Sequence, residues 1–224
     1  MTNKLTSEDA KAFLECAKQD IIASRILYKN KIYSLSVFHL QQSVEKLLKA
    51  LLIHNGICDL DDLKEISHDS WRAMEVLSTR ASHQIPFKEQ NKKQELVPGL
   101  TSIIKKNPEL VATMSYDEII SMIEKTEEIR IYLLKSLLKS LDNGFGDSVL
   151  SKRKRKKVAI DFLNAMATII TASLIISPHE TYARYPDGPL KPSHYTPDLG
   201  IVKATPFLVK RISMLIKIVG IIIK

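Results

Sequence analysis

The chain has 224 residues, 45% hydrophobic and 26% charged, a composition that excludes a wholly disordered chain and allows one large domain or a domain with a long insertion. Aromatic residues make up only 6% and glycines number 7, while leucine, isoleucine and lysine dominate long runs, so helices are favoured over sheets. The 2 cysteines exclude a disulfide framework and a cysteine metal-ligand array.

The formal net charge of +8 is concentrated in the C-terminal third. Residues 151–224 contain 13 basic and 4 acidic side chains, a net charge of +9. The centre of this charge is an unbroken basic run: Lys152, Arg153, Lys154, Arg155, Lys156 and Lys157. Such a run indicates an anionic partner, either nucleic acid or a membrane surface. The alternative is a solvated loop between two helices.

Nothing in the sequence favours a membrane span or a secretory signal. The opening Met1–Asp9 is polar and lacks an apolar core segment. Residues 158–176 are mostly apolar, but Asp161 and Asn164 would be costly in hydrocarbon. We therefore expect a buried core helix there, no span, and a cytoplasmic protein.

Two long amphipathic helices are predicted first, over Ser7–Lys29 and Tyr33–His54, joined by a short turn as an antiparallel hairpin. Ser7, Glu8 and Asp9 supply a cap and match the helix dipole, and Gly56 accepts the conformation that ends the second helix. The acidic stretch 59–65 is expected to be a linker, followed by a helix over 67–81.

The rest of the chain alternates between proline-rich and periodic segments. At most a short helix fits between 86 and 115, and strong periodicity predicts long helices over 116–141 and 158–176. Residues 178–197 hold five of the 9 prolines and are expected to be irregular. A last apolar helix is predicted over 207–222.

The second helix is apolar on one side and carries a polar group on the other. At about 100° per residue, Gln42, Glu45 and Lys49 share the side opposite the leucines. This pattern predicts a central helix with one face in the core and a polar cluster on the other.

The proline-rich segment carries a second group of polar side chains. Tyr182, Arg184 and Tyr185 lie close together, and His194 follows. Arginine and tyrosine together can bind phosphate and stack on a base. Alternatively, the tyrosines anchor the loop and Arg184 pairs with a carboxylate such as Glu45.

Three motifs resemble the HEPN domain family (higher eukaryotes and prokaryotes nucleotide-binding). They are the helix-two string Phe38-His-Leu-Gln-Gln-Ser-Val-Glu-Lys-Leu-Leu-Lys-Ala50, the pair Ser67-His68, and Tyr182-Ala-Arg-Tyr-Pro-Asp187. The resemblance covers about 7–83 and 179–223 and leaves about 85–177 as an insertion. It implies an all-α, single-domain protein over 1–224: an antiparallel helical bundle with a helical insertion before the last helix, commonly a homodimer.

The resemblance also implies a function. Members work on a nucleotide or RNA, often beside a minimal nucleotidyltransferase or in a toxin–antitoxin pair. Carried over by motif, the ligand-binding residues would be Gln42, Glu45, Lys49, His68, Tyr182, Arg184 and Tyr185. His68 is alternatively a capping or interface residue. No cofactor is expected, and no metal site either, because no histidine pair lies at i, i+4.

Whether the protein is an enzyme stays open at this point. Many HEPN domains are metal-independent ribonucleases with an Arg-x4–6-His motif, but here nine residues separate Arg184 from His194. A ribonuclease would use Arg184 with His194 or His179, the histidine exchanging a proton and the guanidinium stabilising the phosphorane. A third alternative is a non-catalytic dimeric scaffold whose polar cluster sets the dimer register.

Overall fold

The protein is all-α, as predicted. The computed structural model describes residues 5–66, 107–125, 168–169, 171–186 and 189–223. Within these ranges the backbone forms helices and turns and no strand. The helices are α1 (Ser7–Lys29), α2 (Tyr33–His54), α3 (Leu60–Ile66), α6 (Pro108–Ala112), α9 (His179–Tyr182) and α10 (Gly200–Ile222), with a 3-10 turn η1 (Pro192–His194) and further helical segments over 116–125 and 171–176.

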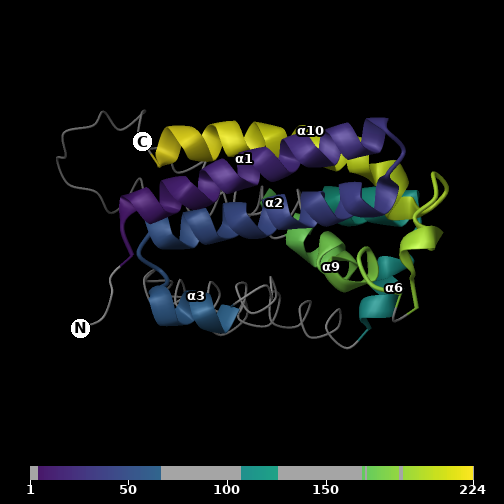
Figure 1. The fold of residues 1–224 in the computed structure, drawn as a ribbon, viewed down its shortest axis with the longest axis horizontal. Coiled ribbons are helices and arrows are strands. Elements are labelled where there is room, and N and C mark those ends of the chain that lie inside the picture. Colours follow the sequence, from purple (N-terminus) through teal and green to yellow (C-terminus); the bar gives the residue numbers. More distant parts are fainter. Residues whose placement is uncertain (1–4, 67–106, 126–167, 170, 187–188, 224) are drawn as a thin grey trace.

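Helices α1 and α2 form the antiparallel hairpin, with the bounds that the sequence predicted (Figure 1). The cap of α1 differs by one residue from the expectation. Thr6 and Asp9 make a reciprocal capping box, in which the Asp9 carboxylate accepts the Thr6 N–H at 2.8 Å. The turn between the helices passes through Lys31, whose φ of 62° is left-handed.

A row of small residues lets the two helices approach closely. Ser24 and Ser36 each donate their hydroxyl to the other's backbone carbonyl at 2.8 Å. Ser43 likewise donates to the carbonyl of Ala17 at 2.8 Å. Such contacts between a side chain and the opposite backbone need small side chains on both helices. The small residues recur every seventh position and are all fully buried: Ala10, Ala17 and Ser24 on α1, and Ser36, Ser43 and Ala50 on α2.

The end of α2 is as expected, but the segment after it is not a linker. Gly56 has φ +62°, the left-handed conformation that glycine adopts without strain. The acidic stretch predicted as a linker forms α3. Asp59 accepts the backbone N–H of Asp62 at 2.9 Å, and Asp62 accepts that of Asp59 at 2.8 Å. This reciprocal cap, with acidic residues at the positive end of the helix, favours helix over coil.

Helix α10 packs against both helices of the hairpin and begins earlier than predicted. The expected start at Phe207 placed Pro206 outside the helix, but Pro206 lies inside α10. The missing proline N–H costs one backbone hydrogen bond, about 3 kcal/mol. Burial of Ile201 and Val202, which are 1% and 0% exposed, offsets that cost. Gly200 lies so close to the turn at Met114 that a Cβ would come within 2.1 Å of the carbonyl oxygen there.

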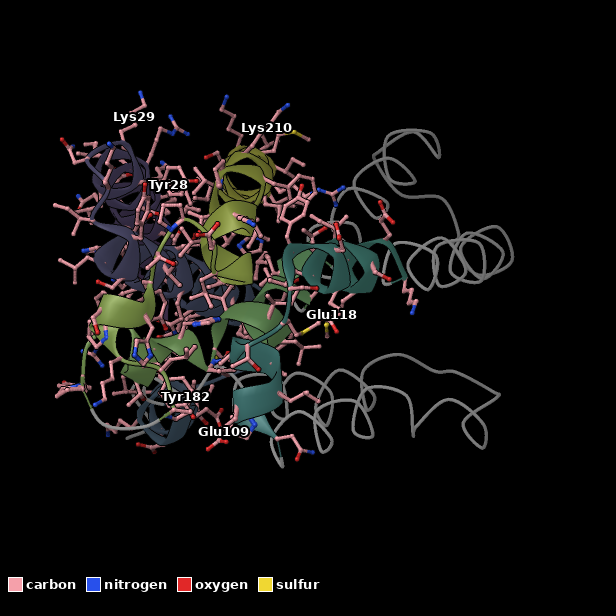
Figure 2. The ribbon with its side chains drawn as sticks, turned by 90° about the vertical axis from the view of Figure 1, so that its right-hand side faces the viewer. Tyr28, Lys29, Glu109, Glu118, Tyr182 and Lys210 are labelled. Atoms are coloured by element: carbon pink, nitrogen blue, oxygen red, sulfur yellow. The ribbon has the colours of Figure 1, made fainter. Side chains whose placement is uncertain are left out.

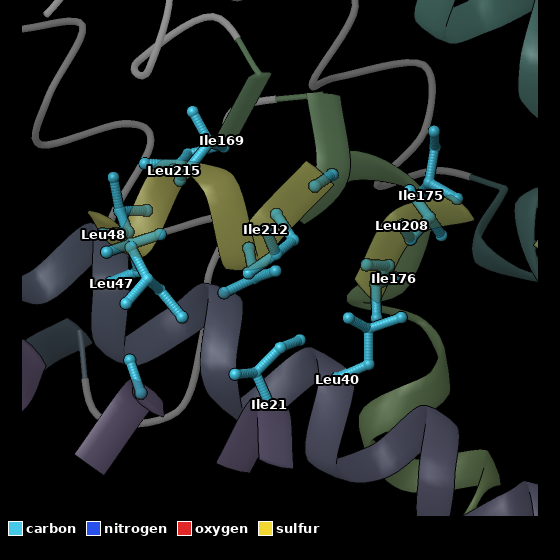
Figure 3. Close-up of a cluster of buried hydrophobic side chains, with 14 of the residues drawn as sticks. Ile21, Leu40, Leu47, Leu48, Ile169, Ile175, Ile176, Leu208, Ile212 and Leu215 are labelled. Atoms are coloured by element: carbon cyan, nitrogen blue, oxygen red, sulfur yellow. The ribbon is translucent and has the colours of Figure 1, made fainter. Parts of the chain in front are cut away.

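The hydrophobic core lies between α2, α10 and the segment 171–176, and Ile169 also belongs to it (Figure 3). Leu40 and Leu47 on α2 are fully buried, as are Ile175 and Ile176. Ile212 of α10 joins them. Because leucine and isoleucine from all three elements meet here, α2 is the central helix that its sequence predicted.

The proline-rich segment 178–197 was expected to be irregular, yet it contains the single-turn helices α9 and η1. Both begin at a proline, Pro178 as the N-cap of α9 and Pro192 inside the first turn of η1. Proline is tolerated at such positions, because the N–H it lacks has no partner there. Short helix α6 also starts at a proline, Pro108, as the sequence allowed.

Several predictions fall outside the described residues: the helix over 67–81 and most of the expected insertion. The described portions of the long helices predicted over 116–141 and 158–176 are helical. In the part of the chain that the structure describes, no helix is both long and apolar enough to cross a membrane.

Candidate functional site

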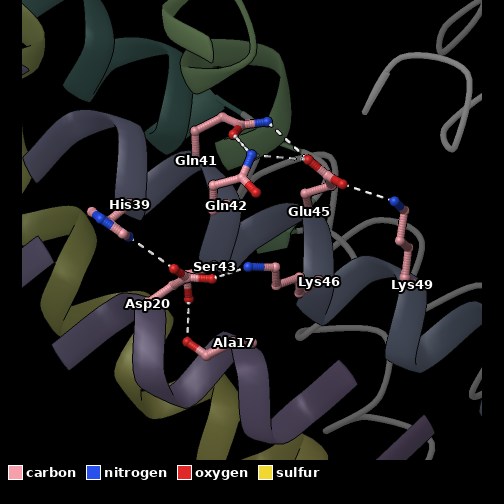
Figure 4. A network of polar contacts seen from close by, with 9 residues as sticks. All are labelled: Ala17, Asp20, His39, Gln41, Gln42, Ser43, Glu45, Lys46 and Lys49. Atoms are coloured by element: carbon pink, nitrogen blue, oxygen red, sulfur yellow. Dashed lines mark hydrogen bonds and ion pairs between the residues drawn. The ribbon is translucent and has the colours of Figure 1, made fainter. Parts of the chain in front are cut away.

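The polar side chains of α2 predicted as a ligand site form a closed network (Figure 4). The Glu45 carboxylate accepts hydrogen bonds from Lys49 at 2.8 Å and from the amides of Gln41 and Gln42, each at 3.3 Å. The Gln42 amide also donates to the Gln41 carbonyl oxygen at 2.7 Å. Glu45 is 2% exposed and Lys49 6%, so this network lies inside the protein.

Burial of this network costs free energy unless its charges are paired. A buried carboxylate and a buried ammonium are tolerated only when each is paired and hydrogen-bonded. The Lys49 ammonium also lies 5.9 Å from the centre of the Phe13 ring, on α1. The network thus ties α2 to its neighbours and leaves little polar surface for a ligand.

Arg184 is exposed and contacts two aromatic rings. Its guanidinium carbon is 4.6 Å from the Phe38 ring centre and 4.9 Å from that of Tyr185. Arg184 Nε donates to the Glu180 carbonyl oxygen at 3.2 Å, and one Nη lies 3.8 Å from the Glu180 carboxylate. The Arg184 side chain is still 36% exposed. The predicted alternative, pairing with Glu45, is replaced by pairing with Glu180.

The two tyrosines of this loop differ in exposure. Tyr182 is half-buried against the core, and burial, followed by the nearby Glu109 carboxylate, raises the pKa of its hydroxyl. Tyr185 is 48% exposed. Tyr182 therefore anchors α9, which contacts α2, while Tyr185 covers the guanidinium of Arg184 from outside.

The two loop histidines occupy different environments. His179 is fully buried, with its Nδ1 2.8 Å from the Tyr195 hydroxyl, and burial lowers the pKa of its imidazole to about 3. His194 is exposed, and its Nδ1 accepts the backbone N–H of Lys191 at 3.3 Å. Arg184 shares no hydrogen bond or ring contact with either histidine in the described structure, and the Arg184–His194 pair remains a prediction.

A second polar cluster, which the sequence analysis missed, joins α1 to α2 on the hairpin (Figure 4). Asp20 on α1 bonds His39 Nδ1 at 2.8 Å, and its second oxygen accepts the Lys46 ammonium. Burial raises the pKa of Asp20, but hydrogen bonds from His39 and Lys46 outweigh it, so the net pKa is lowered. The side chains of His39 and Lys46 are 31% and 27% exposed.

The hairpin itself contains the signal for this pairing. Because α1 and α2 are antiparallel, a residue later in α1 faces a residue earlier in α2. Ala17 thus faces Ser43, and Ser24 faces Ser36. Asp20 and His39 obey the same rule. The His39 ring also lies edge-on to Phe38, with ring centres 5.3 Å apart. Phe38 therefore contacts both Arg184 and His39.

Several predicted residues lie outside the described chain: His68 and the basic run from Lys152 to Lys157. Among the described residues, no group of three or more histidine, cysteine or acidic side chains has an arrangement that could hold a metal ion.

Comparison with known proteins agrees with the motifs. Residues 10–66 match the family model described as the HEPN domain. A curated relative from Methanocaldococcus jannaschii, named "Putative toxin MJ1304", is 48% identical over 48 residues, which are 21% of this chain and 32% of the relative. The match thus spans about a third of that relative's length, and no solved structure matches the chain. Residues 10–66, which include most of α1 and all of α2 and α3, are therefore the part of the chain that resembles the HEPN domain. They contain the first of the three motifs, Phe38 to Ala50.

Proposed function

We propose that this protein is a HEPN-like helical module of the toxin–antitoxin type, and that Arg184 contacts a phosphate of a nucleotide or RNA. The observation that carries the proposal is the contact of the Arg184 guanidinium with the Phe38 and Tyr185 rings, at a position partly open to solvent. The HEPN match over 10–66 and the relative named as a toxin support the wider class.

Contact with two aromatic rings suits this task for a physical reason. The contacts restrict the guanidinium, so less side-chain entropy is lost when its edge meets a phosphate. The Glu180 carboxylate lies 3.8 Å away, a distance that leaves the ion pair weak and exchangeable. An exposed Tyr185 ring beside the guanidinium offers a base a stacking surface.

The other parts of the expected assembly belong to this proposal as well. A homodimer, a partner nucleotidyltransferase and a single domain with a central insertion remain to be tested. In this proposal the buried network of Gln42, Glu45 and Lys49 is structural and does not contact the ligand itself. The basic run 152–157 would add salt-dependent affinity for a nucleic-acid backbone.

Ligand-induced stabilisation tests this proposal. The purified full chain is heated with AMP, with ATP and with a short single-stranded RNA. At 100 times its Kd, a ligand adds about 2.7 kcal/mol to the free energy of unfolding. We expect Arg184→Ala to remove this stabilisation, and Lys191→Ala, a change to an exposed lysine of the same loop, to retain it. If the ligand stabilises both variants equally, Arg184 is not part of the binding site.

A second candidate function, metal-independent RNA cleavage, is favoured by the pair of His39 and Asp20. The carboxylate that accepts from Nδ1–H fixes the tautomer in which Nε2 can take a proton. His39 and Arg184 lie on two sides of Phe38, no more than about 10 Å apart, because 5.3 and 4.6 Å separate their groups from the ring centre. A guanidinium and an imidazole at that separation can contact neighbouring phosphates of one strand.

An assay of labelled-RNA cleavage in EDTA shows which histidine, His39 or His194, takes part in cleavage. We expect His39→Gln and Arg184→Ala to abolish cleavage, and His194→Ala to keep it. Loss in His194→Ala with retention in His39→Gln would restore the loop pair predicted from the sequence. Absence of cleavage by the unmodified protein would leave binding as the function.

A further inference from the structure

We propose that the face shared by α1 and α10 is a docking surface for an acidic amphipathic helix of a partner protein. This α1/α10 face is defined by six residues: Ile22, Arg25, Lys29, Lys210, Met214 and Lys217. It is independent of the Arg184 site, because Figure 2 shows Lys29 and Lys210 together at one edge of the molecule and Tyr182 towards the other.

The two helices lie side by side and run in opposite directions. Near the middle of the face, Arg25 Nη2 of α1 donates to the Ser213 hydroxyl of α10 at 3.1 Å. Nearer the N-terminus of α1, Gly220 of α10 lies against Leu14, where a Cβ would be 3.7 Å from a leucine methyl carbon. The six residues therefore belong to one continuous surface.

Apolar side chains on this face are exposed. Ile22 is 54% exposed and Met214 60%, and on the same outer sides of their helices Ile26 is 53% and Ile221 70% exposed. Large aliphatic side chains that gather on a surface mark interaction sites more often than single ones do. Methionine also adapts its shape to a partner, since its side chain is unbranched and flexible.

The charge of the face is uniformly positive. Arg25, Lys29, Lys210 and Lys217 are exposed. The sequence of α10 from Gly200 to Ile222 contains no acidic residue, and neither does that of α1 from Ile21 to Lys29. A second copy of the same face would be repelled, whereas carboxylates of a partner would be attracted.

The chemistry of the face favours a protein helix over nucleic acid or lipid. None of the six residues is aromatic, whereas single-stranded nucleic acid is bound by cations with aromatic rings for stacking. Helices that lie on a membrane direct their main apolar face to the lipid. The main apolar face of α10 lies in the core instead, through residues such as Leu208 and Ile212. Isolated aliphatic side chains among cations match the anchors and charged flanks of a helix that lies along two others.

A displayed library of helical peptides tests the inference with the full-length protein as bait. We expect the selected peptides to carry Leu or Ile at i, i+3, i+4 and i+7 with Glu or Asp beside them. Binding of the best peptide, measured by fluorescence anisotropy, should weaken at least tenfold in Lys210→Glu/Lys217→Glu and in Ile22→Ser/Met214→Ser. The matched control Lys64→Glu, on exposed α3, should bind as the unmodified protein does.

Thermal unfolding checks that each variant is folded, and Arg184→Ala should keep peptide binding while it loses nucleotide stabilisation. A failure of this inference is thereby separated from a failure of the proposed function. The inference is overturned if selected peptides lack acidic residues, if the two double variants bind normally, or if a 20-nucleotide RNA or anionic lipid vesicles compete for this face more strongly than the peptide.

Discussion

Two polar clusters on the same hairpin differ in how far they are closed to solvent. Glu45 and Lys49 on α2 have side chains that are 2% and 8% exposed. On the other cluster, His39 and Lys46 are 31% and 27% exposed around Asp20. Similar residue types therefore serve two purposes. The polar groups of the closed cluster must find their hydrogen-bond partners within the protein, whereas those of the open cluster are still accessible to solvent. Residue type alone does not distinguish a structural network from a site, whereas exposure does.

The largest effect that tests this comparison is expected from Glu45→Gln. This change removes the Glu45 carboxylate from its buried ion pair with Lys49, and breaking a buried pair in this way costs about 3–5 kcal/mol. Chemical denaturation in urea measures the loss of unfolding free energy. The matched change Glu15→Gln removes an ion pair with side chains 45% and 59% exposed, and should cost under about 1 kcal/mol.

A further variant separates charge from shape in the closed cluster. Replacing both partners, in Glu45→Gln/Lys49→Met, removes the two charges together and should recover most of the stability lost in Glu45→Gln. If Glu45→Gln costs no more than Glu15→Gln, the cluster is open to water in solution, and the comparison fails.

A smaller effect is expected at the open cluster, and it depends on pH. Because hydrogen bonds from His39 and Lys46 lower the folded-state pKa of Asp20 below 3.8, Asp20 stabilises the fold above its unfolded pKa. That contribution, on the order of 1 kcal/mol for a partly exposed charged hydrogen bond, disappears as pH falls through the lowered pKa. Asp20→Asn should therefore be less stable at pH 7 and lose less stability on acidification below about pH 4. Unfolding curves collected from pH 7 to pH 2 measure the stability of both proteins at each pH. An equal change of stability with pH in the two proteins would contradict the pairing.

The smallest effect is the coupling between the clusters. In the described structure no hydrogen bond joins them, although Ser43 lies between them on α2 and contacts Ala17 (Figure 4). The double variant Asp20→Asn/Glu45→Gln should therefore lose the sum of the two single losses, within about 0.5 kcal/mol. Denaturation of the four proteins of this cycle measures the coupling. A larger interaction energy would mean that the two clusters act as one network.

The hairpin was predictable because its signals are local. The bounds of α1 and α2 follow from the 3.6-residue periodicity and from stop signals at Asn30 and Gly56. The helical reading of α3 was missed because few apolar residues mark it, although Asp59 and Asp62 at a spacing of three are a capping signal. The start of α10 was misplaced: the prediction began the helix after Pro206, whereas α10 begins at Gly200 and includes a buried turn before that proline.

The candidate site was predictable only in part. The residue types at Gln42, Glu45 and Lys49 indicated a polar cluster, but whether it is open depends on the segments that cover it. The contact between Arg184 and Phe38 joins residues far apart in the sequence and requires the loop conformation. His39 was set aside because no metal spacing included it, and its partner Asp20 lies on the other helix.

The seventh-residue rows of alanine and serine on α1 and α2 oppose a shift of one helical turn between the two helices. If α2 slid along α1 by a turn, a bulky neighbour such as Leu40 or Leu47 would replace a serine, where two backbones leave room for little more than a hydroxyl. The hydroxyls of Ser36 and Ser43 would lose their carbonyl partners at the same time. The contact of His39 with Asp20 is thus fixed by uncharged side chains. A larger side chain at any position of those rows would separate Asp20 from His39 without altering either residue.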